Sequence, residues 1–153
     1  MRIQAIAKYL PESLFIIIQR NEIDNGHSIL EARFKNFSDY SHWFSIEPPS
    51  IQELKVLPAH QQVIEQIRHI HKTIDKDLRN SGVAKNRCFN LIYENFCDNP
   101  GRIINKLQAF FEANECKVNR IGIIPKNFLP RKEVRIEKRI YKQMVEYSNS
   151  TNL

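Results

Sequence analysis

The sequence is poor in the residues that build disulfide scaffolds and membrane spans. It has three cysteines among 153 residues, and no apolar stretch approaches the length of a membrane span. The cysteines form no CxxC pair, and their odd number leaves one unpaired in any disulfide scheme. We therefore expect reduced thiols that pack as small hydrophobic side chains, which is typical of a cytoplasmic protein.

No metal site is expected. Three of the five histidines, His60, His69 and His71, fall in one expected helix. His69 and His71 are two residues apart and so point to different faces of a helix, and no cysteine or carboxylate completes a recognisable ligand set. The prediction for metals is therefore none.

The positive charge is concentrated near the C-terminus. The net charge is +6, but residues 117–142 carry nine basic and two acidic residues, so that this segment is +7 and the remainder is near −1. An anionic partner is therefore expected at segment 117–142. Nucleic acid is the less favoured partner, because the segment has no helix-turn-helix or aromatic platform.

Apolar periodicity predicts a single α/β domain over residues 1–153. Helices are expected over 2–10, 22–34 and 59–78, strands over 14–18 and 88–93, a helix after Asp98-Asn99-Pro100, and a basic helix from about Arg131. The uninterrupted apolar run at 14–18 is typical of a parallel strand buried on both faces. Gly26, inside the second helix, costs about 1 kcal/mol relative to alanine. It is interpreted either as a position that lets backbone or a ligand approach the helix closely or, as the favoured interpretation, as a tolerated surface position.

Arg20 follows the first strand, where a helix begins. Free backbone N–H groups and the helix dipole favour an anion at such a position, and the guanidinium adds a planar fork for phosphate oxygens. The stretch Leu10–Arg20, followed by Ser28 eight residues after the arginine, resembles the cofactor segment of sulfotransferases. These enzymes use 3′-phosphoadenosine 5′-phosphosulfate (PAPS), and the resemblance implies that Arg20 and Ser28 hold its 3′-phosphate.

A second block, IYENFCDNPGRIINKLQAFFEAN, is similar to another pattern of the same family. The tetrad that begins at Tyr93 and the capped helix after Asn99 occur together at the family spacing. The resemblance implies that Tyr93 lies beside the adenine of PAPS. The alternative is a tyrosine at a strand end that closes the core.

Two further regions have more than one interpretation. Arg131-Lys132 resembles the basic loop with which the family grips the 3′-phosphate, but Glu133 follows where glycine is usual, and a solvated basic face is the default. The aromatic residues of 35–58, Trp43 among them, are expected to pack on the core, and the resemblance makes them a candidate wall of the acceptor pocket.

The resemblance covers only the second half of the family pattern. None of the four glycines lies in a Gly-rich phosphosulfate loop, and the catalytic base that precedes the Arg20 region in the family is not found. The chain is accordingly interpreted as a truncated reading frame, one half of a split protein or a degenerate relative. The expected fold is a partial P-loop-like three-layer sulfotransferase fold, with a short parallel sheet flanked by helices.

The resemblance implies sulfuryl transfer from PAPS to a hydroxyl or amine of a small-molecule or carbohydrate acceptor, without a metal. We expect the isolated chain to be inactive and to form a homo-oligomer or to pair with a complementing N-terminal fragment. The catalytic residues are not assigned. The alternative is a noncatalytic nucleotide-binding or protein-interaction remnant of that fold.

Overall fold

The structure, a computed structural model, describes residues 2–129 and 133–151. The chain forms two compact units, each built from two separated stretches. The first, here the sheet unit, comprises Met1–Arg20 and Asp77–Arg131, and the second, here the helical unit, comprises Asn21–Lys76 and Lys132–Leu153. The fold class is α/β, with a two-stranded parallel sheet flanked by helices, as predicted.

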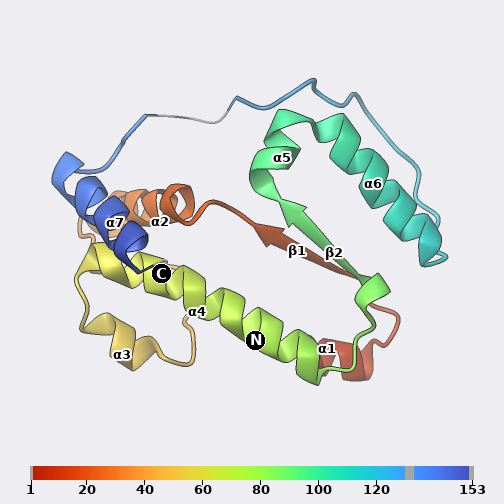
Figure 1. Cartoon of the computed structure of the whole chain (residues 1–153), viewed down its shortest axis with the longest axis horizontal. Helices are drawn as coiled ribbons and strands as arrows, with labels where there is room; N and C mark the ends of the chain where they lie inside the picture. The colour runs from red at the N-terminus through yellow and green to blue at the C-terminus, as the bar shows by residue number, and fades with distance from the viewer. Residues whose placement is uncertain (1, 130–132, 152–153) are drawn as a thin grey trace. The chain divides into compact units, whose positions relative to one another are not determined.

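The sheet unit is centred on two parallel strands, β1 (Phe15–Gln19) and β2 (Cys88–Ile92), which lie side by side in Figure 1. Phe15 is paired with Cys88 and Gln19 with Ile92, so the carboxyl ends of both strands reach the same edge. The β-branched run of three isoleucines in β1 suits a strand.

Helices follow β2 directly. α5 (Tyr93–Asp98) begins at the residue after the strand, and α6 (Pro100–Ala113) comes next. The side chain of Asn99 caps α6 by accepting a hydrogen bond from the Arg102 N–H at 3.0 Å, and Pro100 takes the first helical position, as predicted. The unit also contains α1 (Ile3–Tyr9) and a short 3₁₀ turn, η1 (Lys85–Arg87).

Two expectations for the strands were wrong. The second strand ends at Ile92, so Tyr93 opens a helix instead of closing the strand. β1 is not buried on both faces, because Ile16 and Ile18 expose 42% and 59% of their surface. An apolar run indicates a strand that can be buried, but the sequence does not show whether another element covers each face.

The helical unit packs three long helices around one apolar core. These are α2 (Glu22–Phe37), α4 (Ala59–Asn80, whose last residues belong to the sheet unit) and α7 (Lys138–Ser150). A shorter helix, α3 (Ile51–Lys55), lies in the connection before α4. The buried residues of the core are Leu30, Val63, Ile64, Ile136 and Met144. α2 begins at the cap Asn21, whose side chain accepts hydrogen bonds from the backbone N–H groups of Ile23 and Asp24.

Gly26 is a core residue of α2, so the prediction of a surface position was wrong. A Cβ added to Gly26 would lie 2.9 Å from the sulfur of Met144 and 3.3 Å from Cγ2 of Val63. The absent side chain therefore lets α7 and α4 approach α2 closely. The lower helix propensity of glycine is the cost of this close packing.

The basic helix starts later than predicted. α7 begins at Lys138, not near Arg131, and the preceding residue Glu137 is not helical (φ −53°, ψ 127°). Ile136 is nevertheless buried in the core, so the segment before the helix already packs on the helical unit. Periodicity alone could not separate this buried, non-helical residue from the first turn of a helix.

Trp43 packs against a buried cation. The guanidinium of Arg33 is fully buried, lies 5.1 Å from the centre of the Trp43 ring, and donates hydrogen bonds to Gln62, Gln66 and the carbonyl of Tyr40. Burial lowers the pKa of Arg33 to about 10, so the group stays charged at neutral pH. The aromatic region thus contributes packing, as expected of Trp43.

Candidate functional site

Arg20 and Tyr93 meet at the carboxyl edge of the sheet. Arg20 follows the last residue of β1 and Tyr93 follows the last residue of β2, so the parallel register brings them together. The guanidinium carbon of Arg20 lies 4.9 Å from the centre of the Tyr93 ring. In open α/β sheets, ligands bind outside the carboxyl ends of the strands, and this pair lies at such an edge.

The other surroundings of Tyr93 keep its hydroxyl protonated. A hydrogen bond with the thiol of Cys97, one turn further along α5, raises the pKa of Tyr93. Tyr93 as a whole residue is 37% exposed, so it combines the cation next to its ring with access to solvent. Tyr93 does not close the core, which was the alternative interpretation.

Ser28 lies on α2, in the helical unit, whereas Arg20 and Tyr93 belong to the sheet unit. Its hydroxyl donates a hydrogen bond to the backbone carbonyl of Asp24 at 2.9 Å. This bond within the helix occupies the hydroxyl proton that a phosphate oxygen would accept. Within the sheet unit the structure brings Arg20 and Tyr93 together, and within the helical unit Ser28 is hydrogen-bonded to its own helix.

Arg131 and Lys132 lie outside the described residues. The nearest described arginine beyond them, Arg135, is attached to α2 by two contacts. Its backbone N–H donates to Nε2 of His27 at 3.0 Å, and its guanidinium donates to the carboxylate of Glu31 at 2.7 Å. The sequence analysis missed this pair of acceptors, although a histidine and a glutamate four residues apart on a helix share one face.

Glu31 is almost completely buried between two cations. Lys35, one turn further along α2, lies 2.7 Å from the carboxylate, at the same distance as Arg135. The hydrogen bond from Lys35 and the charges of Arg135 and Lys35 outweigh burial and lower the pKa of Glu31. The C-terminal segment is thus held to α2 by an ionised carboxylate.

Other kinds of site are less well supported. Within residues 2–129 and 133–151, no group of three His, Cys, Asp or Glu side chains could hold a metal ion. In the same residues, no helix is both long and apolar enough to cross a membrane. The cysteines are free, but Cys116 is exposed, so the expectation of buried thiols was wrong for that residue.

The model of the sulfotransferase family matches residues 1–115, three quarters of the chain. The chain belongs to the sulfotransferase family. Arg20, Ser28 and Tyr93 all lie inside the matched range, and Arg135 lies beyond it. No curated protein and no solved structure matches this sulfotransferase-family chain.

Proposed function

We propose that the chain takes part in PAPS-dependent sulfuryl transfer to a hydroxyl or amine of a small-molecule or carbohydrate acceptor. The observation that carries the proposal is the contact of Arg20 with Tyr93, 4.9 Å from guanidinium to ring centre, at the carboxyl ends of two paired strands. Both residues fall within the range that matches the sulfotransferase family.

The residues fit the cofactor in chemical type. Arg20 offers a planar cation for the 3′-phosphate, and Tyr93 offers an accessible ring for the adenine. Ser28 would add a hydroxyl to the phosphate if it gave up its bond to Asp24, and Arg131 and Lys132 would add two cations. When bound, PAPS supplies the activated sulfuryl group.

The 153 residues hold only part of the machinery that this reaction needs. No Gly-rich phosphosulfate loop and no base from the family pattern can be located among them. Stabilisation of the charge that develops at the reacting oxygens is usually the largest catalytic contribution. We therefore propose that the isolated 153-residue chain binds nucleotide without transferring sulfuryl groups at a useful rate.

We propose that both units belong to one cytoplasmic sulfotransferase-like domain. In support, the family match runs from the sheet unit into the helical unit and back. A noncatalytic role through protein interaction is the second candidate. It is favoured by the exposed apolar side chains of Ile16 and Ile18, which a complementing N-terminal fragment or a second copy would cover.

Thermal unfolding with adenosine 3′,5′-bisphosphate tests the nucleotide site. A ligand that binds only the folded state stabilises it by about 2.7 kcal/mol at one hundred times its Kd. We expect a rise in Tm that Arg20→Ala abolishes and Arg79→Ala, at an exposed arginine of α4, preserves. Adenosine 5′-phosphate, which has no 3′-phosphate, should give a smaller rise in the wild type.

Each outcome of these experiments leads to a different conclusion. If the bisphosphate leaves the wild-type Tm unchanged, the nucleotide site is wrong. If it raises the Tm of wild type and Arg20→Ala equally, the nucleotide binds elsewhere. Transfer of labelled sulfate by the chain alone would refute the proposed inactivity and show that the chemistry lies in residues not assigned here.

A further inference from the structure

A groove lies between α6 and the stretch of chain that follows this helix. Residues 114–129, here the return segment, have no helix or strand and pass back beside α6. The segment is fixed at both ends: the Cys116 N–H donates to the carbonyl of Phe111 at 2.9 Å, and the Phe128 N–H donates to that of Cys97 at 2.8 Å. Phe128 also stacks on Phe96 of α5.

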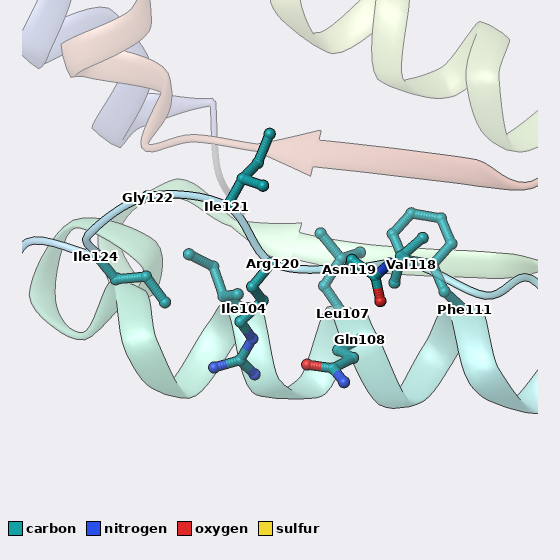
Figure 2. Close-up of a pocket in the computed structure, with 10 residues that line it drawn as sticks. All are labelled: Ile104, Leu107, Gln108, Phe111, Val118, Asn119, Arg120, Ile121, Gly122 and Ile124. Atoms are coloured by element: carbon teal, nitrogen blue, oxygen red, sulfur yellow. The ribbon is translucent and has the colours of Figure 1, made fainter.

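Between these attachments the groove encloses about 240 Å³. Figure 2 shows its lining: one wall comes from α6 and the other from the return segment. The apolar residues are Ile104, Leu107 and Phe111 of α6 with Val118, Ile121 and Ile124 of the return segment. Ile121 is 96% exposed and points away from α6 in Figure 2, so it marks the rim and not the floor.

α6 has more apolar surface than the sheet covers. Phe110 faces the strands, with its ring centre 5.4 Å from that of Phe89 in β2, and Ile103 is buried. Ile104, Leu107 and Phe111 lie on the groove side and stay only half buried under the return segment. The helix therefore presents a second apolar face to a space that protein atoms do not fill.

The rim of the groove carries one cation. Arg120 lines the groove, and its guanidinium hydrogen-bonds the side-chain oxygen of Asn105 on α6. Among the residues that the structure describes, Arg120 forms no ion pair. The one acidic residue of α6, Glu112, accepts a hydrogen bond from Gln108 at 2.8 Å. The groove lining contains no acidic residue.

We propose that this groove binds a small amphiphilic anion, an aromatic or branched alkyl group that carries one carboxylate or sulfate. The apolar body lies on Leu107, Phe111 and Val118, and the oxyanion pairs with Arg120. A dry apolar cavity of about 150 Å³ accepts benzene, so the larger groove has room for about two fused rings. The site lies wholly in the sheet unit and does not depend on the nucleotide assignment.

Methyl NMR of the full chain tests the proposal with three probes of one shape: 1-naphthoate, 1-naphthyl sulfate and the neutral 1-naphthylmethanol. We expect one or both anions to shift the methyl signals of Ile104, Leu107 and Val118. Because a hydrogen bond to a charged group contributes about 1.5–3 kcal/mol, the alcohol should bind roughly tenfold more weakly or worse. Which anion binds more tightly distinguishes a carboxylate ligand from a sulfate ligand.

Arg120→Gln keeps a polar side chain and removes the charge. Arg102→Gln, at an exposed arginine of α6, is the matched control. The first change should reduce anion affinity about tenfold and leave the alcohol unaffected, and the second should change neither. Equal binding of alcohol and anions, anion binding that survives Arg120→Gln, or no methyl shift at millimolar probe would each overturn the proposal.

Discussion

The guanidinium of Arg20 stacks on the ring of Tyr93 with 4.9 Å between its central carbon and the ring centre. The two residues are 73 positions apart in sequence and meet only because β1 and β2 run parallel and in register. A cation next to an aromatic face gives one surface on which both a phosphate and a planar base can bind.

Substitution of Tyr93 should separate what its ring contributes to nucleotide binding from what its hydroxyl contributes. Tyr93→Phe keeps the ring, so its affinity for adenosine 3′,5′-bisphosphate, measured by calorimetry, should stay close to that of the wild type. Tyr93→Leu should weaken binding at least about fivefold, because stacking of a base on an aromatic ring contributes about 1–3 kcal/mol. Tyr9→Leu, at an exposed tyrosine of α1, is the control. A full loss of affinity in Tyr93→Phe would instead assign the binding role to the hydroxyl.

Replacement of Gly26 should destabilise the protein despite a gain in helix propensity. A new Cβ would lie 2.9 Å from the Met144 sulfur, and overpacking of this kind costs about 1–3 kcal/mol. Alanine recovers at most about 1 kcal/mol of propensity, so Gly26→Ala should lower the free energy of unfolding by up to about 2 kcal/mol. Urea denaturation measures this change.

Gly101→Ala is the matched control for Gly26→Ala. Gly101 is also helical, but a Cβ there would meet nothing closer than the Asn99 side-chain oxygen at 3.9 Å. This variant should be neutral or slightly stabilising. Equal effects of the two substitutions would show that α7 does not pack closely on Gly26.

Replacement of the buried cation Arg33 by lysine should lower the stability of the protein strongly, although it preserves the charge. Arg33→Lys keeps the charge but cannot reach Gln62, Gln66 and the Tyr40 carbonyl together, so we expect a loss of about 2–4 kcal/mol. Trp43 is the only tryptophan, so its fluorescence reports unfolding at this site directly. Arg139→Lys, exposed on α7, should change the unfolding curve little, and a similar result for Arg33→Lys would contradict the role of this cation.

Glu31 predicts an acid-sensitive attachment of the C-terminal segment. Its pKa is lowered in the folded state, so its ionised form stabilises the protein above the unfolded-state pKa of about 4.3, and that contribution is lost as the pH falls through the folded pKa. Glu31→Gln should therefore lower Tm at neutral pH and flatten its decline in acid. Glu146→Gln, which breaks an exposed pair with Lys142, should leave the profile unchanged.

Local signals in the sequence predicted the two strands, the cap at Asn99 and a long helix over 59–78, which the structure extends to Asn80. Each of these features depends on residues close together in the chain. Gly26 shows where local reasoning failed. Its role depends on Met144, which lies 118 positions away, and no pattern around Gly26 indicates that contact. The attachment of Arg135 to His27 and Glu31 is of the same kind.

The core of the helical unit has a consequence for synthesis on the ribosome. Met144 and Ile136 come from the last part of the chain, whereas Leu30, Val63 and Ile64 are made much earlier. Until α7 emerges, the surface that Gly26 and α4 offer to Met144 is uncovered, so the nascent chain exposes apolar side chains there while the residues between α4 and α7 are made. Chaperones that shield nascent hydrophobic surface would meet this chain early, and a stop codon before α7 would yield a product for degradation.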